Sequence, residues 1–148
     1  MTTGTTLVAF KQALATALAA RAGLADVQVV YAKPTTGLKG EAIWFEGAAT
    51  DHQIPVLKAG TKKVDEAVSV GMVIQVRIND GRDEEAADLR AVALLAEVQQ
   101  ELAANPRTIE AIQWAEMVGW EHSVGPIGES TSRASRFDIT LRIRARLE

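Results

Sequence analysis

The chain has 148 residues and a formal net charge of -3, with 47% hydrophobic and 24% charged residues. This balance is typical of a folded globular protein and excludes a wholly disordered chain, while the acidic net charge argues against a dedicated nucleic-acid-binding domain. The sequence has no cysteine and only two histidines, which excludes disulfide scaffolds, thiolate metal sites and histidine-rich metal sites. No apolar run approaches the roughly 20 residues that span a bilayer, so we expect no membrane partner.

The N-terminal segment is predicted to be an amphipathic helix from about Thr6 to Ala22. Its large apolar residues recur at steps of three and four, which places them on one side of a helix. These residues are Leu7, Phe10, Leu14 and Leu18. Threonines precede the helix, and Gly23 suits its end.

Two short strands and a long irregular segment are predicted next. The β-branched run Val27–Tyr31 and the aromatic run Glu41–Glu46 favour strands. Proline and glycine between them, in Lys33–Gly40, indicate a loop. The segment Gly47–Gly60 has no clear period and contains a proline, so it is predicted to be a long excursion of the kind that often carries function.

A strand and the longest helix follow. Alternating residues in Val64–Asn79 favour a half-buried strand that bends at Gly71. Acidic residues, which stabilise the positive end of a helix dipole, crowd the start of the next helix. These are Asp83, Glu84, Glu85 and Asp88. This helix is expected to end near Ala104, before Asn105-Pro106. Its predicted apolar stripe is Leu89, Val92, Leu95 or Ala96, and Leu102.

Two strands close the chain. In Thr108–Val124, alternation predicts one face with Trp114, Glu116, Val118 and Trp120, and the opposite face with Ala115, Met117 and Gly119. The segment Gly125–Ser135 is predicted to be a flexible loop. The last segment, Phe137–Leu147, alternates apolar and polar residues throughout, which is the clearest strand pattern in the sequence.

The predicted order is therefore α-β-β-β-α-β-β. Because strands outnumber helices and neighbouring strands are close in sequence, we expect an α+β fold with two main helices on a mostly antiparallel sheet of about five strands. Residues 1–148 are expected to form a single domain.

The sequence predicts no catalytic, cofactor-binding or metal-binding residues. No phosphate-binding loop, dinucleotide-binding motif or nucleophile elbow is present. Asp51 and His52 are adjacent and could act as an acid-base pair, but no nucleophile accompanies them. His122, next to Glu121, is expected to be a solvated residue at a strand end.

Charged and aromatic residues are the candidates for an interaction surface. Arg142, Arg144 and Arg146 share one face of the last strand because its period is two, and Arg136 precedes them. They form either a solvated edge or a basic surface that meets an acidic partner or a nucleic acid passing close by, and these interpretations stay open. Asp83, Glu84 and Glu85 offer a complementary acidic surface. Of the three tryptophans, Trp120 is expected to be exposed, because it lies near a strand end.

The succession of elements resembles the tail terminator (tail completion) proteins of long-tailed phages with non-contractile tails, and related neck proteins. The resemblance covers nearly the whole chain. It rests on the helix, the VQVVY and IWF strands, the VIQVRI strand, the acidic-capped helix DEEAADLRAVALLAEVQQEL and the closing ITLRIRARL strand. It is one of architecture, because no single motif is diagnostic.

The resemblance implies a subunit that forms a ring with copies of itself, typically a hexamer. Such a ring caps the major tail tube protein, meets the head-tail connector protein, and lets genomic DNA pass through its channel without sequence-specific binding. It also implies a virion tail or neck location after assembly in the host cytoplasm. A head-completion or connector protein, and a small bacterial enzyme or ligand-binding domain, remain alternatives.

Overall fold

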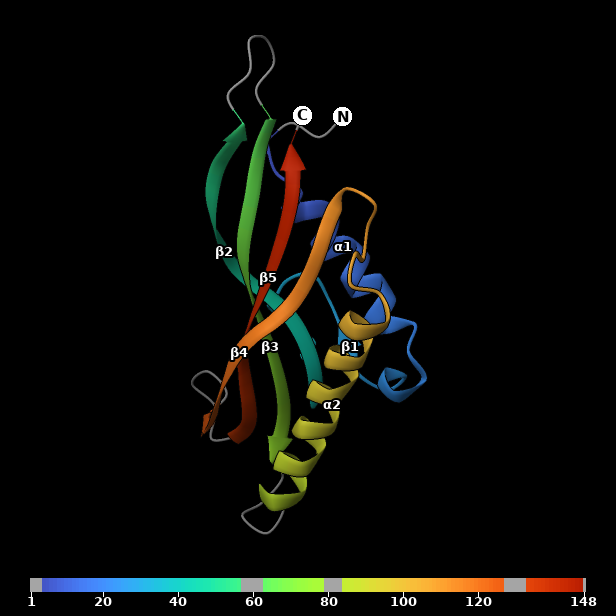
Figure 1. The fold of residues 1–148 in the computed structure, drawn as a ribbon. Helices are drawn as coiled ribbons and strands as arrows, with labels where there is room; N and C mark the ends of the chain where they lie inside the picture. Colours follow the sequence, from blue (N-terminus) through green and yellow to red (C-terminus); the bar gives the residue numbers. More distant parts are fainter. Residues whose placement is uncertain (1–3, 57–62, 79–83, 127–132, 148) are drawn as a thin grey trace.

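The computed structural model describes residues 4–56, 63–78, 84–126 and 133–147, with side chains described for all of these except 51–56, 63, 64 and 147. The elements follow the predicted α-β-β-β-α-β-β order (Figure 1). They are α1 (Leu7–Ala19), β1 (Gln28–Val29), β2 (Glu41–Val56), β3 (Lys63–Ile78), α2 (Glu84–Ala104), β4 (Ile112–Pro126) and β5 (Arg133–Leu147). A single 3-10 turn at Ala22–Leu24 follows α1.

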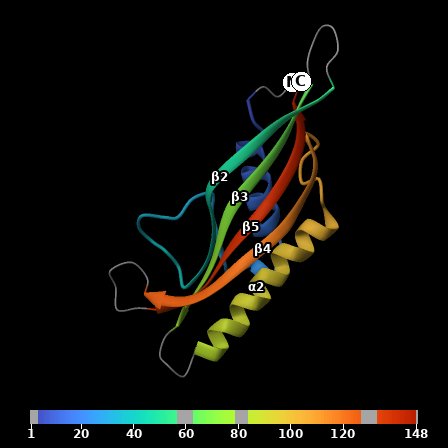
Figure 2. The ribbon, with the colours of Figure 1, turned by 60° about the vertical axis from the view of Figure 1, so that its left-hand side comes forward.

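The five strands form one sheet in the order β1-β2-β3-β5-β4. All neighbouring strands are antiparallel except β1, which pairs parallel to β2 through only two residues. Both helices lie on the same side of the sheet, so the opposite side is left largely open (Figure 2). The α+β class and the mostly antiparallel sheet are confirmed.

The main core lies between the helices and the sheet. Alternate residues of β3 and β5 point into it, because successive side chains of a strand face opposite sides. From α1, the predicted residues Phe10, Leu14 and Leu18 are fully buried. From α2, the buried side consists of Ala87, Ala91, Leu94, Leu95, Val98 and Leu102.

The predicted stripe of α2 is wrong at two positions. Leu89 and Val92 are 64% and 51% exposed, because the helix turns the side of Ala87, Ala91 and Leu94 toward the sheet. Alanine and leucine occupy several sides of this helix, so sequence spacing alone permits more than one stripe. Two large apolar side chains consequently lie on the surface.

Polar contacts hold both helices in place. Arg21, after α1, binds Glu97 of α2 at 2.7 Å and Glu101 at 3.2 Å, and the hydrogen bond that Arg21 donates to Glu97 raises the pKa of Arg21 above its ordinary value. Arg90 of α2 forms a two-pronged bond to Glu41 at the start of β2, with nitrogen-to-oxygen distances of 2.9 and 3.1 Å. These contacts fix α2 against both α1 and β2.

The predicted excursion after Gly47 is wrong where the chain is described. Backbone pairing with β3 continues to Val56, so β2 and β3 are both long strands. One extra residue between Phe45 and Ala48 forms a bulge that absorbs the irregular pattern. Long-range pairing therefore overrides the weak local propensity of this segment. The remaining positions of the excursion, 57–60, lie outside the described residues.

The predicted loop Gly125–Ser135 is also shorter than expected. Strand β4 continues to Pro126 and β5 begins at Arg133, where these two residues face each other across the pair. Residues 127–132 lie outside the described part of the chain. Strand β3 runs without interruption through Gly71 and pairs with β5 in constant register on both sides of it.

A bulge at Val118 changes the faces of β4. Met117 pairs with Leu141 and Gly119 pairs with Thr140, so Val118 is an extra residue. The alternation therefore shifts by one, and Trp120 faces the helix side of the sheet while Trp114 faces the open side. The prediction that both tryptophans share a face is wrong, because a one-residue shift inverts every later position.

Candidate interaction surfaces

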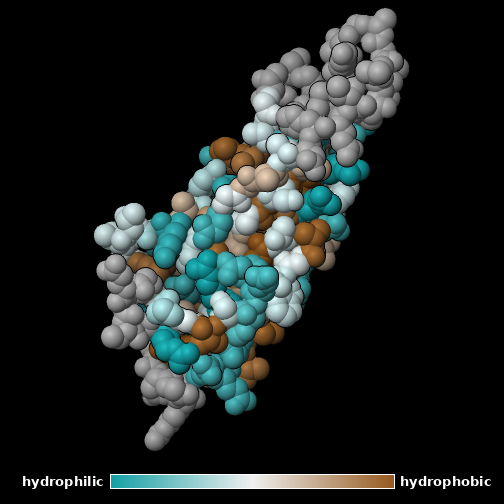
Figure 3. All heavy atoms as spheres, turned by 90° about the vertical axis from the view of Figure 1, so that its left-hand side faces the viewer, coloured by the Kyte–Doolittle hydropathy of each residue, from teal (hydrophilic) through white to brown (hydrophobic). Residues whose placement is uncertain are grey.

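The open side of the sheet carries the predicted arginines. Arg142, Arg144 and Arg146 alternate with the buried residues Leu141, Ile143 and Ala145, so they share the side that no helix covers. Arg136 lies on the same side further back along β5. Figure 3 faces this side and shows polar atoms over most of it, with hydrophobic atoms in small separate patches.

Each arginine of this row has a neighbour of its own within the chain. Arg146 binds Asp65 of β3 at 2.9 Å, and the guanidinium of Arg144 lies 5.9 Å from the ring centre of Trp114. Arg142 is exposed and lies between Ser69 and Glu116 in register. These contacts hold the arginine side chains in place. The net positive charge of this surface is smaller than the sequence suggests, because acidic side chains lie beside Arg142 and Arg146.

A trough without large side chains crosses the open side beyond Arg142. Gly119, Thr140 and Gly71 face one another on three adjacent strands. A Cβ atom at Gly119 would meet nothing within 4 Å, whereas one at Gly71 would lie 3.0 Å from Glu46 Cβ. The trough is therefore open above β4 and closely bordered by β2.

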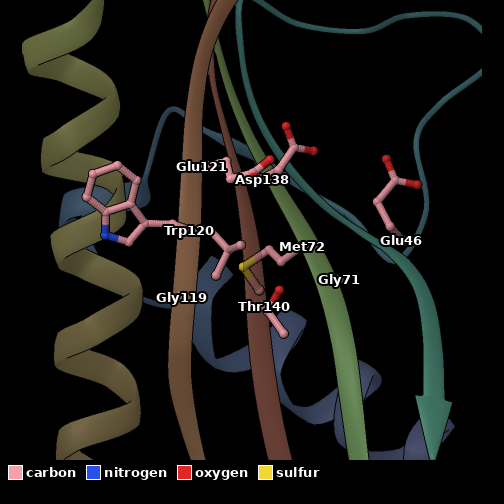
Figure 4. Close-up of a pocket in the computed structure, with 9 residues that line it drawn as sticks. Glu46, Gly71, Met72, Gly119, Trp120, Glu121, Asp138 and Thr140 are labelled. Carbon is pink, nitrogen blue, oxygen red and sulfur yellow. The ribbon is translucent and has the colours of Figure 1, made fainter.

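Three carboxylates border this trough. Glu121 and Asp138 face each other across β4 and β5, and Glu46 approaches from β2 (Figure 4). Arg136 offsets their repulsion, since its Nη2 lies 2.8 Å from Asp138 and 3.7 Å from Glu46. The structure thus assigns Arg136 an ion-pairing role inside the chain. In the same close-up, the ring of Trp120 points away from these carboxylates, toward α2.

The predicted acidic surface lies at the opposite end of β5 from the arginine row. Glu84 is 3.7 Å from Arg133, the first residue of β5, and Glu85 is exposed. The strand distance from Arg133 to Arg142 is about 30 Å, at roughly 3.3 Å per residue. Asp83 lies outside the described residues. The two charged groups are thus not brought together, and they mark opposite ends of the subunit.

His122 belongs to a cluster that sequence reasoning did not find. Its Nε2 lies 2.8 Å from Ser135 Oγ and 3.3 Å from Asp88 Oδ1. A catalytic triad needs the carboxylate on one ring nitrogen and the nucleophile on the other, whereas here both contact the same nitrogen. Ser135 is also completely buried. This arrangement joins α2 to the β4–β5 pair and does not have the geometry of a hydrolase.

Within the described residues, no group of three histidine, cysteine or acidic side chains is arranged to hold a metal ion. None of the helices in this part of the chain is long and apolar enough to cross a membrane. The backbone of Asp51 and His52 belongs to β2, and their side chains lie outside the described ones.

Exposed hydrophobic residues form a further surface. Trp120 is 52% exposed, as predicted, while Trp44 is completely buried. Val92 of α2 lies beside the part of β4 that contains Trp120. Two helix–strand contacts flank this position: Asp88 contacts His122 on one side, and Gln99 contacts Met117 on the other. The bulge and the rotation of α2 create this surface, so only the position of Trp120 was readable from the sequence.

No protein-family model matches the sequence, and no curated protein sequence matches it. Among solved structures, the chain is similar to a component of the "Virion of native gene transfer agent (GTA) particle". The similarity covers 93% of this chain and 94% of the other, with a TM-score of 0.59 and 17% sequence identity. At this identity the similarity establishes a shared fold.

Proposed function

We propose that this protein is a structural subunit of a phage-like virion. The supporting observation is that nearly the whole chain shares its fold with a nearly complete chain of a virion particle. In the described residues, Ser135 and Asp88 both contact the same ring nitrogen of His122. This geometry is unsuited to a catalytic triad. An assembly role needs surfaces instead of a reactive site, and the open sheet side and exposed hydrophobic residues provide them.

Within the virion, the proposed role is that of a tail terminator. Copies of the chain form a ring, six being the expected number, which caps the completed tail tube and presents its other side to the head connector. The charged groups at opposite ends of β5 fit this role, because a ring between two partners needs two different end surfaces. Negative-stain electron microscopy of purified tail tubes mixed with the protein tests it. Rings at one end of each tube support the role, and tubes that remain bare contradict it.

The arginine row is proposed to contact an acidic partner at the tube or connector side. Changing Arg142, Arg144 and Arg146 together to glutamate is expected to weaken tube attachment at least tenfold, since about 1.4 kcal/mol of lost attraction suffices. Co-sedimentation with tubes measures this. Arg77→Glu, an exposed charge reversal at the other end of the β3–β5 pair from the row, is the control. Equal attachment of the triple variant and the control would remove the arginines from the interface.

A head-completion or connector protein is the alternative within the same class. It would bind the portal side and leave tail tubes untouched. The partner that co-purifies with a tagged chain separates the two roles.

A further inference from the structure

The large exposed hydrophobic residues lie at the two lateral ends of the sheet. Four of them form what we call the α2–β4 patch: Leu89, Val92, Val118 and Trp120, each between 50% and 64% exposed. The other two form the α1–β1 patch: Val8, 50% exposed, and Tyr31, 38% exposed. Among the side chains that the structure describes, these six are the exposed large hydrophobic ones. Strands β4 and β1 are the two edges of the sheet.

The two patches belong to continuous lateral surfaces. Val92 and Trp120 lie level where α2 runs beside β4, and Leu89 is one turn from Val92. At the other end, the amine of Lys11 lies 4.8 Å from the ring centre of Tyr31. Val8 precedes Lys11 by three residues, so both are on the same side of α1. Each surface thus combines an edge strand with the helix beside it.

Both edges also have backbone groups available for pairing. Among the described residues, β4 pairs only with β5, and β1 with the two residues after it covers β2 only from Ala42 to Phe45. Unpaired edges accept a further strand, and proteins commonly protect them with lysine, arginine or proline. Strand β4 contains no lysine or arginine, and its only proline is the last residue. Its edge is therefore suited to contact another chain.

The charges around the two ends are complementary. Exposed Glu116 and Glu121 lie on β4, whereas exposed Lys33 and Lys39 lie in the loop between β1 and β2, a segment without acidic residues. One end is therefore apolar and acidic, and the other is apolar and basic. Because the two ends differ, a copy that binds its neighbour through its basic end still has its acidic end free to bind the next copy.

We infer that the α2–β4 patch of one copy binds the α1–β1 patch of the next, so that the chain assembles head to tail through its lateral ends. This inference rests on the proposed ring and assigns the surfaces that form its junctions. It separates these junctions from the arginine row, which remains available to other virion components. Repetition of a head-to-tail contact closes a ring when the rotation per subunit divides a full turn.

The test uses two variants that each disable one end. Leu89→Ser combined with Trp120→Ser disables the α2–β4 patch, and Val8→Ser combined with Tyr31→Ser disables the α1–β1 patch. Each variant alone is expected to be monomeric by native mass spectrometry. Mixed together, they are expected to form a one-to-one dimer and nothing larger, since only one intact junction can form. Ala104→Ser, at the exposed end of α2, is the control and should assemble like the unmodified chain.

Three other outcomes would contradict either the inference or the proposed ring. If the unmodified chain assembles and both variants still do, the patches are not the junctions, and the virion role stands. If the mixture stays monomeric while the unmodified chain assembles, the junction is not head to tail and the inference is overturned. If the unmodified chain stays monomeric even beside tail tubes, the proposed ring itself fails. A Val92→Ser and Val118→Ser variant repeats the test without Trp120, and circular dichroism checks that each variant is folded.

Discussion

Replacing Trp44 by alanine is expected to lower the free energy of unfolding by about 3–5 kcal/mol, the usual cost of removing a buried tryptophan. Trp44 is completely buried on the open side of the sheet, where it packs with Ala42 and Val73 beneath Val30 and Leu38. Its Nε1 donates a hydrogen bond to Glu46 at 3.1 Å. This small second core holds the loop after β1 against the sheet. Urea denaturation measures the effect.

Trp120→Ala provides the matched comparison, because it removes the same side chain from a half-exposed position. Trp120 makes an edge-to-face contact with Phe137 at 5.1 Å, so its removal is expected to cost about 1 kcal/mol of stability. Its main effect should be on assembly. Equal losses of stability in the two variants, or unchanged assembly of Trp120→Ala, would contradict the distinction between a core tryptophan and an interface tryptophan.

Replacing Glu66 by alanine is expected to cost about 3 kcal/mol, because a buried ionic acceptor with several hydrogen bonds is lost. Glu66 is completely buried on β3 and accepts the Thr6 N–H at 3.1 Å and the Thr6 hydroxyl at 3.0 Å. The Thr5 hydroxyl also donates to it. The carboxylate thereby caps the start of α1 and fixes that helix to the sheet.

Two controls accompany the Glu66 variant. Glu66→Gln keeps the volume and one acceptor, so it should lose less, about 1 kcal/mol. Asp65→Ala removes the adjacent acid on the open side, where its pair with Arg146 is partly exposed and contributes about 0.5 kcal/mol. Thermal denaturation should place the three variants in that order of severity. A Glu66→Ala chain as stable as Asp65→Ala would show that the cap does not hold α1.

Sequence periodicity was sufficient where one face of an element is strongly apolar. The alternation of Phe137–Leu147 and the spacing of Phe10, Leu14 and Leu18 gave the right elements and the right buried sides. These patterns also placed the three arginines correctly on one side of β5. The α+β class followed from the order of such elements.

Periodicity failed where contacts distant in sequence decide the structure. The bulge at Val118 depends on pairing with β5, and the extension of β2 depends on pairing with β3. The contact between Thr6 and Glu66 joins residues 60 positions apart, and the cluster of Asp88, His122 and Ser135 joins a helix with two strands. The lateral patches arise from such effects, so the interaction surface could be only partly predicted.

Native mass spectrometry of the unmodified chain, alone and beside purified tail tubes, tests the central claim most directly. The claim is that the surfaces of this protein serve assembly with copies of itself and with virion components. A closed ring of identical 15.9-kDa subunits, six copies being expected, is the predicted result. A chain that remains monomeric under both conditions would contradict the claim.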